Sequence, residues 1–424
     1  MNVSQWIASL ILQNVLSGKN LDKTFVVFFE KYSKKLEEIN KPEIKNLVYG
    51  ALRFLGESSF IINKLVKRRI DDNSLECLLY VALYQINHDR ATDFTIVDQV
   101  VNACKKINSK KCGFINAILR NYLRDKVNLR SQAEHDEQAN LNYPDWWVTK
   151  IKKEYPDNWI EILKSGNRHP SLTLRINQRK VSLQDYEQTL KEKGIDYLNI
   201  SKEALILKNP TDVQKIPNFI DGYVSIQDYG AQLAGHLIDL KKGHKVLDLC
   251  AAPGGKTCHM LELEQIELTA VDLNKKRVEM IKDNLGRADL KAKVINAKVD
   301  KSNEWWDGKQ FDRIMLDAPC TASGIVRRHI DIKWLRRESD LEFFSNQQFE
   351  LLDASWTMLK DKGKLLYVTC SIFSEENRAV IEKFKKINNV KEIEIKFPNN
   401  IISIENQLIP NDNHDGLFYA LLEK

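Results

Sequence analysis

Several features that mark other classes of protein are absent from this chain of 424 residues. No run approaches the roughly 18 apolar residues that a membrane-spanning helix needs, so we expect no membrane partner. The N-terminus lacks a basic region followed by an apolar core and a cleavage site, which argues against a signal peptide and favours a cytoplasmic protein. Internal repeats and low-complexity tracts are also missing. With 43% hydrophobic and 29% charged residues, the sequence predicts a globular protein of two or three domains.

The cysteines lack the C-x-x-C spacing that many zinc sites use, so we expect no metal. A cytoplasmic chain also gives no reason to expect a disulfide framework. Cysteines in helical patterns are ordinarily small buried thiols, and four of the seven fall in such patterns: Cys77, Cys104, Cys112 and Cys258. Cys320 and Cys370 do not.

Two common nucleotide-binding patterns are absent as well, G-x-G-x-x-G and the first glycine of a P-loop. A related device is present at residues 245–257. The apolar run 246–249 predicts a buried parallel strand, the Pro-Gly-Gly sequence at 253–255 breaks it, and a helical pattern follows from Lys256. Glycines let a ligand approach the backbone, and the free amides of a helix start favour negative groups.

A second predicted strand, 268–271, ends at Asp272, where an acidic side chain can hold the hydroxyls of a ribose. The glycine turn and this acid together predict an adenosine-containing cofactor at the carboxyl end of the first strand. The alternative interpretation is a glycine turn that serves only packing.

Helical periodicity dominates the beginning of the chain and predicts an all-helical domain over residues 1–130. The expected helices lie within 6–15, 25–36, 44–70, 75–86, 94–107 and 114–127. The polar, weakly periodic segment 131–142 predicts a linker. Mixed patterns over 143–235, with strands near 171–177, 204–207 and 223–226, predict a small α+β subdomain.

From residue 236 to residue 424, strand patterns alternate with helical ones, which predicts a Rossmann-like α/β domain with a doubly wound sheet of seven strands. The strands are expected at 246–249, 268–271, 292–295, 311–316, 364–369, 392–396 and 417–422. In such a sheet the functional groups lie at the carboxyl ends of the strands.

Charge is distributed unevenly along the chain. Residues 1–130 contain 21 Lys and Arg against 13 Asp and Glu, a net charge of +8, although the whole chain carries +6. The remaining residues therefore carry −2. A basic domain beside a near-neutral body predicts binding to RNA or DNA. A solvated basic surface without a partner is the alternative.

Two of the predicted strands end in loops that contain cysteine. Strand 311–316 is followed by Asp-Ala-Pro-Cys (317–320), and strand 364–369 is followed by Cys370 and a serine. Adjacent parallel strands would bring Asp317, Cys320 and Cys370 to the same edge of the sheet as the glycine turn. A single loop cysteine is usually inert, but two of them beside a cofactor turn predict a reactive site.

A thiolate, a carboxyl group and an adenosine cofactor suit methyl transfer to carbon 5 of cytosine, which is a poor nucleophile. Addition of a thiolate to carbon 6 makes the ring enamine-like, so that carbon 5 can attack an electrophilic methyl group. A carboxyl group beside the ring supports the negative charge that develops there when it is protonated or shares a proton with ring nitrogen 3. Loss of the carbon-5 proton then frees the thiol, and a second cysteine could assist this step. The base must leave its stack to reach the pocket.

Five stretches give the chain a close resemblance to the S-adenosylmethionine-dependent RNA cytosine-C5 methyltransferases. They are Asp-Leu-Cys-Ala-Ala-Pro-Gly-Gly-Lys-Thr (248–257), Asp-Ala-Pro-Cys (317–320), Thr-Cys-Ser (369–371), the segment 324–334, and Gln-Asp (227–228) before 231–235. With a helical NusB-like domain in front, the chain is similar to the Sun-type members that act on 16S ribosomal RNA. The resemblance implies S-adenosyl-L-methionine as cofactor and, as substrate, the 16S cytosine conventionally numbered 967. No protein partner is evident.

The resemblance also implies roles for individual residues. Cys370 would be the nucleophile, Cys320 would help to release the product, and Asp317 would hold the cytosine edge with Lys256 near the base. The cofactor would be held by Cys250, Ala251, Ala252, Pro253, Gly254, Gly255, Lys256, Asp272, Arg277, Asp300 and Asp317. The chemistry of the sequence alone does not rank the two cysteines.

One position departs from the family pattern. The third strand is usually followed by Gly-Asp, whose acid faces the adenine amine, but residues 296–300 read Asn-Ala-Lys-Val-Asp and Lys298 stands in that place. Either Asp300 replaces the acid or cofactor affinity is weakened. The basic domain and Lys298 leave open an RNA-binding, antitermination-type protein with a passive methyltransferase domain. Another RNA, such as tRNA, is a further alternative substrate.

Overall fold

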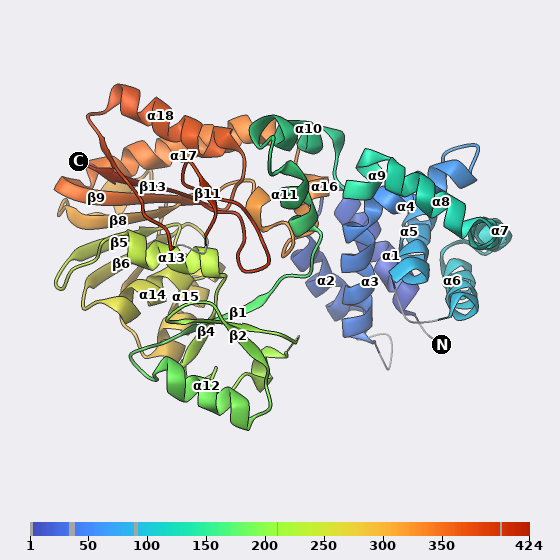
Figure 1. Cartoon of the computed structure of the whole chain (residues 1–424), viewed down its shortest axis with the longest axis horizontal. Coiled ribbons are helices and arrows are strands. Elements are labelled where there is room, and N and C mark those ends of the chain that lie inside the picture. Colours follow the sequence, from blue (N-terminus) through green and yellow to red (C-terminus); the bar gives the residue numbers. More distant parts are fainter. Residues whose placement is uncertain (1–2, 34–38, 89–91, 210, 399–400) are drawn as a thin grey trace. The chain divides into compact units, whose positions relative to one another are not determined.

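The computed structural model describes residues 3–33, 39–88, 92–209, 211–398 and 401–424 (Figure 1). The chain forms two compact units. The first comprises Met1–Asn167 together with His329–Arg336, and the second comprises Arg168–Arg328 together with Arg337–Lys424. Within the described ranges, no helix has both the length and the apolar character needed to cross a bilayer.

The first unit is helical, as the apolar periodicity predicts. Its first elements are α1 (Ser4–Leu16), α2 (Leu21–Ser33), α3 (Lys41–Arg53), α4 (Leu55–Leu65), α5 (Asn73–His88), α6 (Asp93–Asn108), η1 (Ser109–Lys111) and α7 (Cys112–Arg124). The predicted stripe 44–70 is two helices, because Phe54 leaves helical geometry with φ −111° and ψ 28°. Helix α2 ends at Ser33, and residues 34–36 of the predicted helix lie outside the described residues.

Residues 131–142, where the polar sequence predicts a linker, are helical in the structure. Helices α8 (Lys126–His135) and α9 (Glu137–Leu141) cover this segment. They bury Ala133, Ala139 and Leu141, which are too sparse in a polar sequence to produce a clear periodicity. Helices α10 (Asp145–Glu154) and α11 (Trp159–Gly166) then extend the helical unit to Asn167.

The segment His329–Arg336 returns to the helical unit from far along the chain. Its short helix α16 (Ile332–Leu335) carries Lys333, which is fully buried. Nζ of Lys333 donates to the carbonyl of Arg53 at 3.1 Å and to Oδ1 of Asn167 at 2.7 Å. Burial holds the pKa of Lys333 well below its usual value. A distant part of the sequence thus completes the interior of the helical unit.

The second unit begins with a small α+β layer. An antiparallel sheet in the order β2-β3-β1-β4 is formed by β1 (Leu172–Ile176), β2 (Tyr197–Asn199), β3 (Ala204–Leu207) and β4 (Val224–Ile226). Helix α12 (Leu183–Glu192) packs on it through Tyr186 and Leu190, and η2 (Val213–Lys215) follows β3. Strand β2 was not predicted from the sequence, since it is short and mostly exposed.

The large sheet contains all seven predicted strands. They are β5 (Lys245–Leu249), β6 (Glu267–Asp272), β7 (Lys293–Asn296), β8 (Phe311–Asp317), β9 (Leu359–Thr369), β10 (Lys391–Ile393) and β13 (Phe418–Glu423). The order is β11-β12-β13-β9-β8-β5-β6-β7, with β10 also paired to β13. Strands β5 to β9 are parallel and β13 is antiparallel to β9. The additional strands β11 (Ser403–Ile404) and β12 (Gln407–Leu408) are too short for a pattern to indicate.

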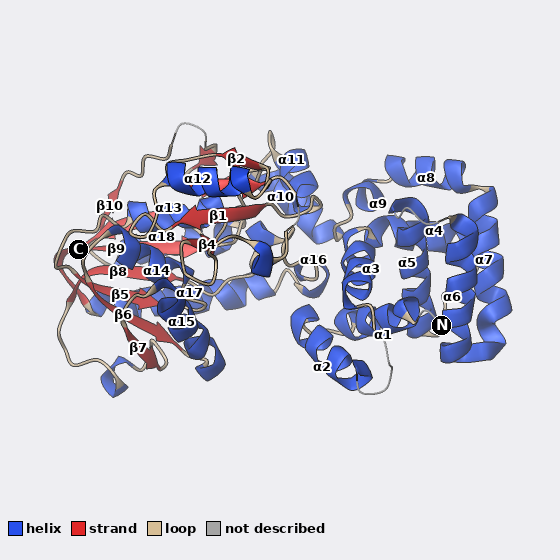
Figure 2. Cartoon of the chain, turned by 90° about the horizontal axis from the view of Figure 1, so that it is seen from below, coloured by secondary structure: helices blue, strands red, loops and turns tan. Residues whose placement is uncertain are grey.

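Helices cover both faces of this sheet (Figures 1 and 2). These helices are α13 (Tyr229–Leu237), α14 (Gly255–Leu263), α15 (Lys275–Ala288), α17 (Asp340–Thr357) and α18 (Arg378–Ile387), with the short elements η3 (Ser302–Glu304), η4 (Ser323–Ile325) and η5 (Ser374–Glu376). Because successive strand residues point to opposite faces, Val246 packs on the side of α13, α14 and α15, and Leu247 packs on the side of α17 and α18. The result is the doubly wound α/β architecture that the sequence predicts.

Candidate active site

The parallel strands reverse their order of winding between β5 and β8. From β5 the chain proceeds outward to β6 and β7, whereas from β8 it proceeds to β9 on the other side. Loops that leave the carboxyl ends of β5 and β8 therefore diverge, and such a switch point opens a ligand crevice. Predicted site residues lie at this end of the sheet, since Asp272 ends β6, Asp317 ends β8 and Cys370 follows β9.

The turn between β5 and α14 has a backbone that a ligand can approach closely. Gly254 precedes the helix with φ +99°, and a Cβ there would lie 3.1 Å from Cα of Ile281. Glycine adopts this conformation readily, and the first amides of α14 lack helical partners. Cys250 also has a positive φ, of 58°. Burial raises the pKa of Cys250 to about 12, which disfavours its thiolate form.

Asp272 holds the turn in place from the end of β6. Its Oδ2 accepts a hydrogen bond from the amide of Ala252 at 3.1 Å, and its Oδ1 accepts one from the amide of Asn274 at 3.0 Å. Arg277 lies 3.4 Å from the same carboxylate and donates to the carbonyl of Ala252 at 2.8 Å. The structure therefore brings both Asp272 and Arg277 against the predicted cofactor turn.

Lys256 and Asp317 form an ion pair across the switch point. Nζ of Lys256, on α14, donates to Oδ2 of Asp317 at 2.7 Å. Burial alone would lower the pKa of Lys256, but the charge and hydrogen bond of Asp317 raise it, with a smaller contribution from Cys370. Lys256 therefore stays protonated close to a carboxylate and a thiol.

Cys320 and Cys370 lie side by side on the loops that follow β8 and β9. Their Sγ atoms are 3.3 Å apart, although 50 residues separate the two cysteines in the sequence. The hydrogen bond with Cys370, together with burial, raises the pKa of Cys320 well above its usual value. Cys320 is thus held as a thiol that can donate its proton to the sulfur of Cys370.

Glu376, which sequence reasoning missed, connects the two cysteine loops. Its carboxylate is fully buried and accepts hydrogen bonds from the amide and hydroxyl of Thr321, at 2.7 and 2.5 Å, and from the hydroxyl of Ser371 at 2.5 Å. Nε2 of Gln348 donates to the same carboxylate and to the carbonyl of Pro319. Burial raises the pKa of Glu376 in spite of these bonds. No local pattern marks this residue, because Thr321 lies 55 positions away.

Asp248 is a second buried carboxyl group close to the turn. Oγ1 of Thr257 donates to its Oδ2 at 2.5 Å, whereas its Oδ1 has no hydrogen-bond partner in the part of the chain that the structure describes. Burial raises the pKa of Asp248 to about 7. The group therefore changes charge near neutral pH.

Lys298 and Asp300 lie in the loop after β7, and both side chains are exposed. Asn296, at the end of β7, donates through Nδ2 to the carbonyls of Asp272 and Leu273 at 2.9 and 2.8 Å. The structure thus places Asn296 against the end of β6 and leaves Lys298 and Asp300 on the loop surface. The role of Asp300 stays a prediction.

Glu203, His236 and His259 are residue types that bind metals, and their donor atoms lie within 4.8 Å of one another. The Nε2 atoms of His236 and His259 lie 2.5 and 3.1 Å from the same oxygen of Glu203. Both imidazoles can donate to this carboxylate, so hydrogen bonding accounts for the cluster without an ion. The expected absence of a metal stays a prediction.

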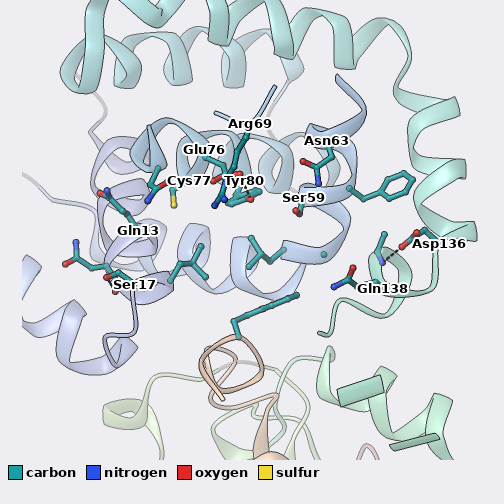
Figure 3. A pocket seen from close by; sticks show the side chains of 18 residues that line it. Gln13, Ser17, Ser59, Asn63, Arg69, Glu76, Cys77, Tyr80, Asp136 and Gln138 are labelled. Carbon is teal, nitrogen blue, oxygen red and sulfur yellow. Dashed lines mark hydrogen bonds between the residues drawn. The ribbon is translucent and has the colours of Figure 1, made fainter. Parts of the chain in front are cut away.

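A pocket of about 600 Å³ lies within the helical unit, and none of the predicted catalytic residues lines it. Figure 3 shows Gln13, Asn63, Arg69, Glu76 and Gln138 around it. Its lining combines amides with charges of both signs, so it does not select for an anion. This pocket is therefore separate from the predicted chemistry.

A neighbouring pocket of about 440 Å³ in the same unit is basic. Four cations line it, Lys67, Arg68, Arg69 and Lys111, and they outnumber the two acids Asp71 and Asp72. The ring of Phe114, which is 43% exposed, also lines it. Cations beside an exposed ring suit a nucleic acid, because the cations can contact phosphates and the ring can stack on a base. We refer to the four cations and Phe114 together as the basic pocket.

Comparisons with known proteins cover three successive parts of the chain. Residues 4–124 match the NusB family, 143–214 match the ferredoxin-like domain of RsmF/B-like methyltransferases, and 236–423 match the 16S rRNA methyltransferase RsmB/F. The ribosomal RNA small subunit methyltransferase B of Pseudomonas syringae pv. tomato is 36% identical over 98% of this chain and 96% of that protein. The protein of the same name from Vibrio cholerae serotype O1 is 34% identical over 100% and 98%.

Among solved structures, that of the protein PH0851 is 26% identical and covers 99% of both chains with a TM-score of 0.79. A doubly wound sheet, a ferredoxin-like layer and a NusB-type helical domain define a multidomain methyltransferase of Rossmann-like fold. The chain belongs to the family of 16S rRNA methyltransferases RsmB/F. The predicted resemblance and fold class are thereby confirmed, while the roles of single site residues stay predictions.

Proposed function

We propose that this chain transfers the methyl group of S-adenosyl-L-methionine to carbon 5 of a cytosine in 16S ribosomal RNA, through a covalent bond between Cys370 and carbon 6. The observation that carries the proposal is the pair of thiols 3.3 Å apart, with Lys256 and Asp317 at the same edge of the sheet. Direct methyl transfer would need no thiol. A covalent intermediate needs both a nucleophile and a means of release.

The residues of the crevice fit S-adenosyl-L-methionine. The positive φ of Gly254 exposes the backbone of the turn, and buried Asp272 offers acceptor oxygens at the strand end where ribose hydroxyls are held in related folds. The turn 250–256 would hold the methionine part, with Arg277 beside Asp272 and Asp300 available to the adenine. When bound, the cofactor supplies an electrophilic methyl group.

Asp317 and Lys256 would hold the cytosine while Cys370 attacks it. Lys256 stabilises the carboxylate of Asp317 until the base arrives. As Cys370 attacks, its thiol proton would pass to this carboxylate, which then shares the proton with ring nitrogen 3 and supports the charge there. That proton would leave to solvent when the product is released. The new bond between Sγ of Cys370 and carbon 6 places electron density on carbon 5, which takes the methyl group. Carbon 5 of the adduct then carries both a methyl group and a proton.

Cys320 would resolve this adduct by relaying one proton. The carbon-5 proton passes to the sulfur of Cys320, and the thiol proton of Cys320 passes to Sγ of Cys370 as the carbon–sulfur bond breaks. The base regains its double bond, and both cysteines end as thiols. The short separation of the sulfurs and the raised pKa of Cys320 support this step, because proton transfer needs a close and protonated donor.

The helical unit would bind the RNA substrate. Residues 1–130 carry a net charge of +8, and the basic pocket combines four cations with an aromatic ring. The relatives from Pseudomonas and Vibrio are named as methyltransferases of small-subunit ribosomal RNA. These observations favour 16S ribosomal RNA as substrate. The cytosine conventionally numbered 967 as target, and the cytoplasm as place of action, are the expectations that the family resemblance adds to the proposal.

Transfer of a labelled methyl group to 16S RNA tests the proposal. We expect label in 5-methylcytosine, and we expect Cys370→Ala to lower the rate by more than about 100-fold, because the nucleophile is lost. Binding of S-adenosyl-L-methionine should persist in this variant, since the thiol acts on the base. Cys104→Ala, at a buried cysteine of α6, is the control and should transfer normally.

Other outcomes of this assay contradict parts of the proposal. Cofactor binding without transfer by the wild-type protein would indicate a passive methyltransferase domain on an RNA-binding protein. Label in tRNA but not in 16S RNA would identify a different substrate. Near-normal transfer by Cys370→Ala, together with loss in Cys320→Ala, would reverse the roles of the two cysteines.

A further inference from the structure

The two cysteine loops meet at one buried carboxylate. Thr321 directly follows Cys320, and Ser371 directly follows Cys370. The hydroxyls of Thr321 and Ser371 both donate to Oε2 of Glu376, each at 2.5 Å. A single oxygen atom thus fixes the neighbours of both cysteines.

Further bonds join the same two loops around this oxygen. Oγ of Ser323 lies 2.9 Å from Oγ of Ser371, and it accepts a hydrogen bond from the amide of Ile372 at 2.9 Å. The amide of Gly324 donates to the carbonyl of Cys370 at 2.8 Å. These hydrogen bonds link the backbone after β8 to the backbone after β9.

Burial of the Glu376 carboxylate costs free energy of folding. A fully buried carboxylate loses its hydration, and this loss is offset only when donors surround the group. Donors from Thr321, Ser371 and Gln348 supply that compensation. The charge of Glu376 also contributes, after the hydrogen bond with Cys370 and burial, to the raised pKa of Cys320.

We propose that Glu376 is a positioning residue of the methyl transfer, whose carboxylate sets the separation of Cys320 and Cys370 that the proton relay requires. This inference rests on the proposed covalent mechanism. Attack on carbon 6 needs Cys370 alone, whereas release needs the two sulfurs in contact. Loss of the carboxylate should therefore slow release more than it slows attack.

Single-turnover reactions of Glu376→Gln with 16S RNA and labelled cofactor test this role. Glutamine replaces one acceptor oxygen with a donor, so in either orientation one pair of donors loses its acceptor: the two hydroxyls at Oε2, or the Thr321 amide and Gln348 at Oε1. We expect product release at least about 10-fold slower, with a protein–RNA adduct that survives denaturing electrophoresis. The Kd values for cofactor and RNA should stay within about twofold of wild type, because Glu376 touches neither ligand. Glu382→Gln, on the exposed side of α18, is the matched control and should release product normally.

The adduct separates positioning from a purely structural role. A structural glutamate would lower cofactor binding, attack and turnover together, and no adduct would accumulate. If Glu376→Gln fails to fold, Ser371→Ala and Thr321→Val remove one donor each and should show the same adduct more weakly. Wild-type release without adduct in the folded variants overturns the proposal. If Cys320→Ala also forms no adduct, the covalent mechanism itself is wrong, whereas an adduct in Cys320→Ala alone contradicts only the role of Glu376.

Discussion

Asp248 shows how burial sets the protonation state of a single residue near the site. Its pKa is raised from 3.8 to about 7, and burial is the main cause. A carboxyl group with a raised pKa binds its proton more tightly in the folded state than in the unfolded state. Its contribution to stability is therefore full below the unfolded pKa and is lost as the pH rises through about 7.

This loss predicts the behaviour of Asp248→Asn. Relative to wild type, the free energy of unfolding of the variant should improve by about 1–3 kcal/mol between pH 5 and pH 8, because the variant has no carboxylate to bury. Urea unfolding at the two pH values measures the difference. Asp353→Asn, at an exposed position of α17, should show no such change. An equal effect of Asp248→Asn at both pH values would mean that the carboxyl group is ionised in the folded state throughout this range, which contradicts the raised pKa.

The sequence indicates site residues that stand beside a strand end or a glycine turn. Lys256, Asp272, Asp317 and Cys370 belong to this group, because each ends a strand or follows one within a recognisable motif. Glu376 also lies seven positions after β9, but no motif marks it, and its partner Thr321 is on the loop after β8, which only the folded sheet brings close. Residues whose role depends on distant partners are therefore the ones that sequence reasoning misses.

At the scale of elements, the turn between β5 and α14 depends on one backbone conformation. Gly254→Ala would place a Cβ at φ +99° and 3.1 Å from the backbone of Ile281, so the turn must shift. We expect the affinity for S-adenosyl-L-methionine to fall by about 10-fold or more, since the turn would hold the cofactor. Isothermal titration with the cofactor measures this affinity.

Gly286→Ala provides the matched control for that substitution. Gly286 lies in α15, and a Cβ there meets open space. The control should bind the cofactor as wild type does and should gain roughly 0.5–1 kcal/mol of stability, because alanine favours a helix. Equal cofactor affinity in Gly254→Ala and wild type would contradict the assignment of the turn.

Helices and strands could be predicted from the sequence where an apolar pattern extends over most of the element. Helices α1 to α7 and strands β5 to β9 follow directly from such patterns. Helices α8 and α9 were not predicted because they bury few apolar residues. Strand β2 was not predicted because Tyr-Leu-Asn at 197–199 shows no alternation of apolar and polar residues. The break at Phe54 also lacks a proline or glycine that would announce it.

In the whole molecule, we expect the helical unit to bind RNA and the other unit to carry out the chemistry. The combined variant Lys67→Ala, Arg68→Ala and Lys111→Ala should weaken binding to 16S RNA. It should also reduce the slope of log affinity against log salt by about 2–3, since each lost phosphate contact removes roughly one unit. Cofactor affinity should be unchanged. Filter binding over a range of salt concentrations gives the slope.

A charge-matched control lies in the ferredoxin-like layer. Lys191→Ala, Lys193→Ala and Lys202→Ala remove three exposed cations there. This control should keep the salt slope of wild type. An equal slope in both triple variants would show that the basic pocket is only a solvated surface.

The division of the chain into two compact units could be predicted only in part from the sequence. Composition and charge separate a basic helical region from an α/β region, because each has its own periodicity. The return of residues 329–336 to the helical unit could not be predicted, since Lys333 and its partners Arg53 and Asn167 are far apart in sequence. A buried lysine between apolar neighbours gives no local sign of that contact.

The covalent mechanism with two cysteines is tested most directly by looking for a protein–RNA adduct on a denaturing gel. Cys320→Ala should attack and methylate the base but fail to relay the proton, so a labelled adduct should accumulate. Cys320→Ala combined with Cys370→Ala should form none, because no nucleophile remains. An adduct that persists in the double variant, or full turnover by Cys320→Ala without an adduct, would contradict the two-cysteine mechanism.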